Sequence, residues 1–223
     1  MELSCNCGST AFRFPEPRPR CRIRCCCNDC WQKNLWAEWR GDAARRGRQR
    51  GALELAYLGV PFVAVDGAAD RVRFNRLRDG AASTNCVSTC CGTLMMVDHP
   101  CYEARSVLVF PEEQAQLRLV GDGEGDGYGD GDGDGKSTKA YDAACKAELS
   151  CYVGYAKDLP PEDADAILCE SVGAADGPIF FDTEELSTEH QALRDAHRAL
   201  RTADFPPGAE GFTFATLMQH HDR

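Results

Sequence analysis

Apolar and polar residues alternate over short stretches between residues 9 and 111, and turn-forming residues separate these stretches. An alternation with a period of two places one side of a segment in a core, which is typical of β-strands. On this pattern we predict strands at Cys21–Cys25 and Arg71–Arg78. Short apolar segments predict further strands at Ser9–Phe14, Leu53–Gly67 (broken at Gly59 and Pro61), Thr93–Pro100 and Ser106–Pro111, the last two around a turn at Pro100. The first half of the chain is therefore predicted to be mostly β.

The second half contains the clearest helical pattern. Apolar residues recur on one side over Asp182–Phe205, and Pro206 marks the end of this predicted helix. Elsewhere we predict a short helical turn at Trp31–Trp39, a strand within Ser150–Ile167 and a frayed C-terminus that holds His220 and His221.

These elements divide the chain into three parts. We predict a mostly β domain over residues 1–120, a low-complexity acidic loop over 121–139, and a C-terminal extension over 140–223 that packs a strand and a helix on the same domain. The loop alternates glycine with acidic residues and cannot bury apolar surface. It carries six acidic residues, and removing them from the net charge of −10 leaves only −4. The charge therefore does not indicate a general acidic surface for partners.

Composition excludes some functions. Hydrophobic residues make up 43% of the 223 residues, which is enough for a packed core. The acidic loop lacks the terminal glutamate of an EF-hand, so calcium binding is not predicted. Arg40–Gly51 is a single basic run without interleaved aromatic residues in an acidic chain, so nucleic-acid binding is not predicted either.

The location of the protein decides how its 14 cysteines are interpreted. The first ten residues have neither a basic nor an apolar segment, and no apolar run is long enough to cross a bilayer. We therefore expect a soluble, cytoplasmic protein with no membrane partner. In a reducing compartment, clustered cysteines are metal ligands or redox groups more often than disulfides, which would be the interpretation for a secreted chain.

Three short stretches concentrate the cysteines. They are CNCG with Cys5 and Cys7, CCCNDC with Cys25, Cys26, Cys27 and Cys30, and CVSTCCG with Cys86, Cys90 and Cys91. Structural zinc takes four protein ligands, whereas catalytic zinc keeps one position open. Cys5 and Cys7 need two more thiols, which the late stretch can supply. The more isolated cysteines are predicted to be small buried apolar residues: Cys21, Cys101, Cys145, Cys151 and Cys169.

In this order and spacing, the three motifs resemble those of the glutathione-dependent formaldehyde-activating family, which includes centromere protein V and has a zinc-binding, Mss4-like β fold. The family pattern is C-x-C-G, then C-H-C-x-x-C, then C-x-x-C-G-[ST], and its counterparts here lie within Leu3–Pro111. The resemblance implies two zinc ions per chain. One is structural, held by Cys5, Cys7 and the late cysteines, and the other lies at a catalytic set of three: Cys25, Cys27 and Cys30.

The chain departs from the family pattern at two places. Cys26 stands where the family has a histidine. Counting back from Cys91, the first late cysteine of the family falls on Ser88, so Cys86 or Cys90 must replace it with the help of a bulge. Our preferred pair is Cys86 with Cys91, and Cys90 is the alternative.

A zinc ion with three thiolates has a net negative charge, which makes it poor at activating water but able to bind a substrate thiol. The predicted function is therefore a carbon–sulfur lyase acting on a thiol adduct such as S-hydroxymethylglutathione, which forms from glutathione and formaldehyde. Arg22, Arg24 and Lys33 are candidates for binding the carboxylates of glutathione, unless they face solvent. The alternative function is a zinc-stabilised binding or scaffolding module without catalysis.

Overall fold

The computed structural model describes residues 1–25, 27–41, 53–111, 116–118, 152–154, 179–180, 195–196 and 198–221. Within these ranges the chain is mostly β, with two sheets and a small number of helices. Several predictions concern residues outside these ranges: the acidic loop, Cys26, Cys145, Cys151 and Cys169.

The smaller sheet is antiparallel and has the strand order β10-β1-β2-β5. Its strands are β1 (Glu2–Ser4), β2 (Ala11–Arg13), β5 (Val63–Val65) and β10 (Gln116–Arg118). Leu3 of β1 lies opposite Phe12 of β2, and both side chains are fully buried. The β1–β2 hairpin is therefore fixed by its inward face, and its turn carries the first cysteine pair.

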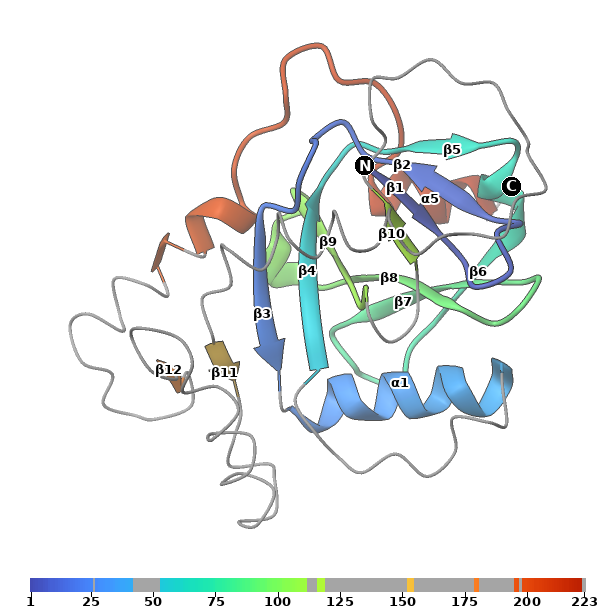
Figure 1. The fold of residues 1–223 in the computed structure, drawn as a ribbon, viewed down its shortest axis with the longest axis horizontal. Helices are drawn as coiled ribbons and strands as arrows, with labels where there is room; N and C mark the ends of the chain where they lie inside the picture. Colours follow the sequence, from blue (N-terminus) through green and yellow to red (C-terminus); the bar gives the residue numbers. More distant parts are fainter. Residues whose placement is uncertain are drawn as a thin grey trace.

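The larger sheet has eight strands in the order β12-β11-β3-β4-β9-β8-β7-β6. Neighbouring strands are antiparallel, except that β11 runs parallel to both β3 and β12 (Figure 1). The bounds are β3 (Cys21–Cys25), β4 (Leu53–Gly59), β6 (Val72–Asn75), β7 (Thr84–Ser88), β8 (Leu94–Asp98), β9 (Ser106–Val109), β11 (Tyr152–Gly154) and β12 (Ile179–Phe180).

Hydrophobic residues of this sheet form a core on each of its faces. Along β4, Ala56 and Leu58 belong to one core, whereas Leu55 and Tyr57 belong to the other, as the period of two requires. The first core also contains residues of β1, β2 and helix α5 (Phe214–His221). The second is covered by helix α1 (Asn28–Gly41), which lies below the ends of β3 and β4 in Figure 1.

Most predicted strands are confirmed, and the differences have physical causes. Strands are present in every predicted segment of the first half, and the break between β4 and β5 lies where Gly59 and Pro61 predict it. A 3-10 turn, η3 (Pro100–Tyr102), separates β8 from β9, and another, η2 (Ala68–Arg71), precedes β6. Strand β7 was not predicted, because its sequence, TNCVS, neither alternates nor forms an apolar run, although all five of its residues are buried.

The helices differ more from the predictions. The short turn predicted at Trp31–Trp39 is a 14-residue helix, α1, whose start lies within the cysteine-rich stretch and has Asp29 in its first turn. Of the helix predicted over residues 182–205, the described residues 195–196 and 198–201 are helical.

The prediction of a frayed C-terminus is wrong. His220 and His221 belong to α5, whose Phe214 and Leu217 are buried in the first core. The His220 Nε2 atom lies 2.7 Å from Asp70 Oδ1, which attaches the helix to η2.

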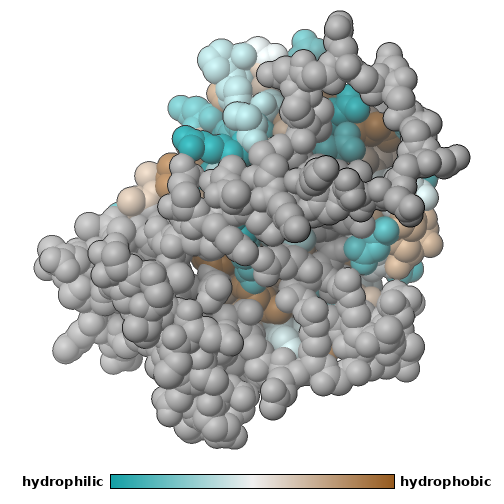
Figure 2. Space-filling view, viewed as in Figure 1, coloured by the Kyte–Doolittle hydropathy of each residue, from teal (hydrophilic) through white to brown (hydrophobic). Residues whose placement is uncertain are grey.

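Among the described residues, no helix is both long and apolar enough to cross a membrane. On the face shown in Figure 2, small apolar areas of described residues lie beside hydrophilic ones. Four large hydrophobic side chains of the described residues are exposed: Leu35, Val63, Leu200 and Phe205.

Candidate metal centres

The first candidate centre lies between two hairpin turns that are far apart in the sequence. Cys5 follows β1 and Cys7 lies in the turn that leads to β2, whereas Cys90 and Cys91 lie in the turn between β7 and β8. The four sulfur atoms are within 4.8 Å of one another. Each hairpin supplies two ligands, so this four-cysteine centre links the smaller sheet to the larger one.

The sulfur geometry of this centre fits one zinc ion. The Sγ atom of Cys90 is 3.5 Å from that of Cys5 and 3.4 Å from that of Cys7, and Cys5 and Cys7 are themselves 3.4 Å apart. Cys91 Sγ is 3.8 Å from Cys90 Sγ. Four sulfurs at about 2.3 Å from a tetrahedral zinc ion would be separated by roughly 3.8 Å. The four-cysteine centre therefore needs little rearrangement to bind the ion.

Backbone turns hold these cysteines in place. Gly8 and Gly92 have φ angles of +76° and +74°, a region that L side chains rarely adopt. The Gly8 amide donates to the Cys5 carbonyl at 2.9 Å. The Thr10 amide donates to Cys5 Sγ at 3.3 Å, which favours the thiolate form that binds a metal. A glycine after each cysteine pair is thus explained by the turn that it allows.

The preferred late pair, Cys86 with Cys91, is not the one that the structure brings together. Cys86 is fully buried in the first core, and burial raises the pKa of its thiol. Cys90 takes its place in the group, and the β7–β8 register shifts between Cys86 and Val87. Ser88, where the family has a cysteine, places its Oγ atom 3.4 Å from Cys91 Sγ and accepts a hydrogen bond from the Thr93 amide.

The thiols of the four-cysteine centre differ in acidity. Burial raises the pKa of Cys5 to about 12. Hydrogen bonding to Ser9 lowers the pKa of Cys7. Burial would also raise the pKa of Cys91, but the Ser88 and Thr93 hydroxyls outweigh it and leave a pKa of about 6. Cys91 and Cys7 are thus prepared to act as thiolate ligands.

The second candidate centre lies at the junction between β3 and α1. Cys25 ends β3, Cys27 immediately precedes α1, and Cys30 lies in the first turn of that helix. Their three sulfur atoms are within 4.8 Å of one another. The Cys30 amide donates to Cys27 Sγ at 3.3 Å, so the helix N-terminus directs a backbone donor at the sulfur. The three ligands of this three-cysteine centre therefore come from six consecutive residues at a strand–helix junction.

Two of the three thiols of this centre are buried, and the third is half-buried. Cys25 and Cys30 are only 4% and 7% exposed, whereas Cys27 is half-buried. The Cys25 and Cys30 thiols hydrogen-bond to Cys27 and lower its pKa to about 3, with help from the charge of Lys33. Within the described residues the group contains three ligand atoms. Three thiolates suit a soft-ligand metal such as zinc and leave a fourth position for another donor.

The candidate carboxylate-binding residues have different environments. Arg22 is buried and forms an ion pair with the buried Glu54, so it is already neutralised. The side chain of Arg24 lies outside the described part of the chain. Lys33 is also buried, but it lies near Cys27 and Cys30, where its charge lowers the pKa of Cys27. Between the two candidates with described side chains, Lys33 is the one whose charge acts on the three-cysteine centre and that forms no ion pair with a described acid.

The isolated cysteines are only partly as predicted. The ten cysteines of the described residues are free thiols. Cys21 is partly buried against the second core. Cys101, predicted to be buried, is exposed, and its Sγ atom lies 2.9 Å from His99 Nδ1. The spacing between cysteines does not indicate this pair, because the partner of Cys101 is a histidine.

Arg201 lies far from the cysteine motifs in sequence and was not among the predicted residues. Its guanidinium carbon is 5.2 Å from the centroid of the Tyr57 ring. Tyr57 belongs to the same core as Cys25 and Cys30. No sequence signal identifies this residue, because folding alone brings the C-terminal part of the chain to β4.

Comparisons of the chain with protein-family models, with curated proteins and with solved structures found no match. The interpretation of the two centres therefore depends on their geometry, and the family resemblance of the motifs remains a prediction.

Proposed function

We propose that this protein is a zinc-dependent carbon–sulfur lyase that acts on an adduct of a small thiol, such as the adduct of glutathione with formaldehyde. We also propose that its two sheets form an Mss4-like zinc-binding fold in which the four-cysteine centre is structural. In this proposal the thiol substrate binds at Cys25, Cys27 and Cys30.

The observation that carries the proposal is the difference in ligand number between the two centres. Among the described residues, the four-cysteine centre offers four sulfurs, a complete set for structural zinc, whereas the group at the β3–α1 junction offers three. A zinc ion held by these three thiolates would have one position of its tetrahedron for another sulfur. A thiol substrate supplies that donor.

The chain's own residues would hold and shield the reacting groups. A zinc ion held by the three cysteines would lower the pKa of a thiol that binds to it. The burial of Cys25 and Cys30 keeps water away from one side, so the substrate approaches beside Cys27. The Lys33 charge offsets part of the negative charge of three thiolates. In the synthetic direction the substrate sulfur bonds to the aldehyde carbon and the thiol proton ends on the new hydroxyl, so no oxidant is needed.

A second function, a zinc-stabilised binding or scaffolding module, is favoured by the burial of Cys25 and Cys30. Buried thiolates around a metal are typical of structural sites. The two functions differ in whether the three-cysteine centre accepts a further thiol.

Exchange spectroscopy tests the proposed lyase directly. NMR exchange between formaldehyde and S-hydroxymethylglutathione should accelerate in proportion to the zinc-loaded protein, and Cys27→Ser should abolish the acceleration. Cys21→Ser is the matched control, because it changes a nearby thiol outside the metal group and should leave the rate unchanged. No acceleration at high protein concentration, with two zinc ions bound, would favour the binding module instead.

A further inference from the structure

Cys101 and His99 form a pair that belongs to neither metal centre. Cys101 is exposed, and its Sγ atom lies 2.9 Å from Nδ1 of the His99 ring. A thiol within hydrogen-bonding distance of an imidazole is the arrangement of a nucleophile and its base. The Cys101–His99 pair is therefore a candidate for thiol chemistry of its own.

A backbone hydrogen bond decides which ring nitrogen of His99 carries the proton. The Cys101 amide donates to His99 Nδ1 at 3.1 Å. A nitrogen that accepts this bond has no proton of its own, so the neutral ring is protonated at Nε2 and the Cys101 thiol is the donor toward Nδ1. His99 is thus held in the tautomer that can remove the thiol proton.

The pKa values of the two groups agree with this arrangement. Desolvation and the Lys33 charge lower the pKa of His99, so its ring is uncharged at neutral pH. Desolvation of the sulfur raises the pKa of Cys101, so the exposed residue carries a protonated thiol. Such a thiol is a weak nucleophile by itself and gains from a neighbouring base.

A short turn fixes the positions of both residues. His99 precedes η3 and Cys101 lies within it, and the Tyr102 amide donates to the His99 carbonyl at 2.9 Å. The buried Tyr102 ring has its centroid 5.7 Å from that of His99 and 5.3 Å from that of Tyr57. The base therefore stands on a turn that the second core anchors.

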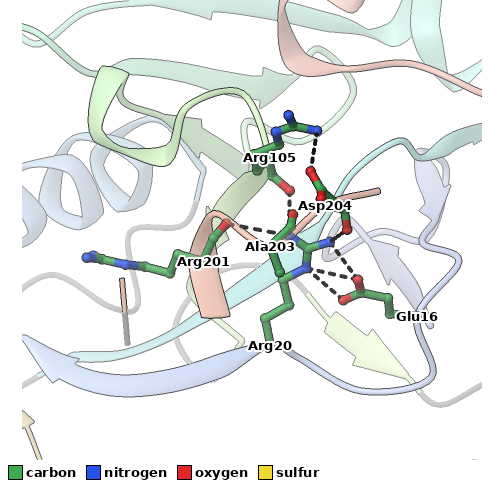
Figure 3. A network of polar contacts seen from close by, with 6 residues as sticks. All are labelled: Glu16, Arg20, Arg105, Arg201, Ala203 and Asp204. Atoms are coloured by element: carbon green, nitrogen blue, oxygen red, sulfur yellow. Dashed lines mark hydrogen bonds and ion pairs between the residues drawn. The ribbon is translucent and has the colours of Figure 1, made fainter. Parts of the chain in front are cut away.

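A network around Arg20 attaches the C-terminal segment to the residues that follow this turn. The Arg20 guanidinium pairs with the Glu16 carboxylate at 2.7 Å and donates to the Arg105 carbonyl at 3.1 Å. It also donates to the carbonyls of Ala203 at 2.8 Å and Asp204 at 3.2 Å (Figure 3). The backbone around residue 105 is thus tied to residues 203 and 204.

This attachment places charged groups around the Cys101–His99 pair. Arg198 forms an ion pair with Glu103 at 3.3 Å, two residues beyond Cys101. The charged groups that act on the pair are Lys33, Asp98, Arg198 and Arg201. Of these groups and the pair itself, His99 has the ordinary pKa nearest to neutral pH. A change of reactivity near pH 6 therefore reports on His99.

We propose that Cys101 is a nucleophilic thiol, activated by His99, that exchanges with the disulfides of small thiols. Exchange requires an accessible sulfur and a base, whereas acyl transfer would also require donors that bind an oxyanion. This inference is independent of the proposed function, which concerns Cys25, Cys27 and Cys30.

The exchange is balanced without a further reagent. The Cys101 sulfur bonds to one sulfur of the disulfide, and the bond between the two disulfide sulfurs breaks. His99 Nδ1 takes the thiol proton and passes it to the leaving thiolate. Cys101 is oxidised to a mixed disulfide, and the small disulfide is reduced to one thiol and the bound half.

Mass spectrometry of the zinc-loaded protein measures this exchange at Cys101 separately from the other thiols. The protein is incubated with glutathione disulfide and quenched with acid, and the mixed disulfide is quantified by peptide mapping. Between about pH 7 and 8.5 the rate should be almost independent of pH, and it should fall below about pH 6.5 as His99 takes up a proton. A rate that rises about tenfold per pH unit throughout would indicate an unassisted thiolate and overturn the proposal.

His99→Asn removes the base while keeping the turn. The asparagine oxygen can still accept the Cys101 amide, because asparagine is a favoured N-cap residue. The exchange rate near pH 7 should fall by about 100-fold and should then rise about tenfold per pH unit. His220→Asn is the matched control, because it makes the same substitution in an exposed histidine that contacts Asp70, and it should leave the rate at Cys101 unchanged.

Each outcome decides the proposal. If the His99 variant exchanges as fast as the wild type, His99 is not the base and the proposal is wrong. If both histidine variants lose the rate equally, the effect is a general one and the proposal is again wrong. If the His99 variant does not fold, the pH profile of the wild-type protein decides alone. The proposed lyase is unaffected in every case, because its test concerns the three-cysteine centre.

Discussion

The two cysteine centres of this protein are built in opposite ways. The four-cysteine centre joins two hairpin turns separated by more than eighty residues, whereas the three-cysteine centre comes from one strand–helix junction. Metal in the first closes a long loop and ties two sheets together. Metal in the second would add little to chain connectivity, and the described residues supply three ligands to it. Ligand number and sequence separation therefore give the two centres different expected contributions to stability.

The largest expected effect separates the two centres by stability. Cys5→Ser should release the metal that joins the sheets and lower the free energy of unfolding by about 4 kcal/mol or more, because loss of a structural metal belongs to the most damaging changes. Cys27→Ser should remove one zinc ion per chain while the fold survives. Metal analysis together with thermal unfolding checks both variants. Equal destabilisation by the two variants would show that the two centres do not differ in their contribution to stability.

The next effect distinguishes Cys90 from Cys86. Cys90→Ser should cost the four-cysteine centre its zinc ion, because Cys90 Sγ lies within 3.5 Å of both Cys5 and Cys7. Cys86→Ala should keep both ions and cost only about 1–2 kcal/mol for a small cavity in the core. Zinc content per chain checks this directly. Loss of metal from the Cys86 variant would instead support the sequence-based choice of ligands.

A rescue experiment sharpens the ligand assignment. Ser88 Oγ lies 3.4 Å from Cys91 Sγ, which is close to the ligand spacing. Ser88→Cys should therefore restore part of the zinc binding that Cys90→Ser removes, at some cost because Ser88 Oγ accepts a bond from Thr93. Zinc affinity by competition with a chelator measures the rescue. An affinity equal to that of the single Cys90 variant would show that the bulged turn cannot present a ligand from position 88.

The smallest effect concerns pH near the three-cysteine centre. Burial and the nearby Lys33 ammonium both disfavour the charged form of His99, so its pKa lies below the usual 6.5. As pH falls below about 6.5 the unfolded chain takes up this proton first, so His99 reduces stability on the acid side. Lys33→Met should raise the His99 pKa, and ¹H–¹⁵N NMR titration measures it. An unchanged value would place the Lys33 charge too far from His99 to affect its protonation.

The amino-acid sequence by itself determined the local parts of this protein. The alternating pattern located β3 and β6, because every second residue of a half-buried strand faces the core, whereas short apolar segments located β4, β8 and β9, which are almost fully buried. The short spacing of Cys25, Cys27 and Cys30 likewise indicated a compact set of three, because neighbours in one turn stay close in any fold. By contrast, β7 is buried on both faces and left no alternation to detect.

Only the tertiary structure decided which distant residues meet. Cys86 lies within β7 with its side chain in the first core, whereas Cys90 lies in the turn after β7, where folding brings it beside Cys5 and Cys7. Arg201 reaches Tyr57 because the Arg20 network anchors the segment after it, and His220 meets Asp70 because α5 buries Phe214 and Leu217. Such contacts depend on how whole helices and strands pack together, and a local sequence pattern does not predict this packing.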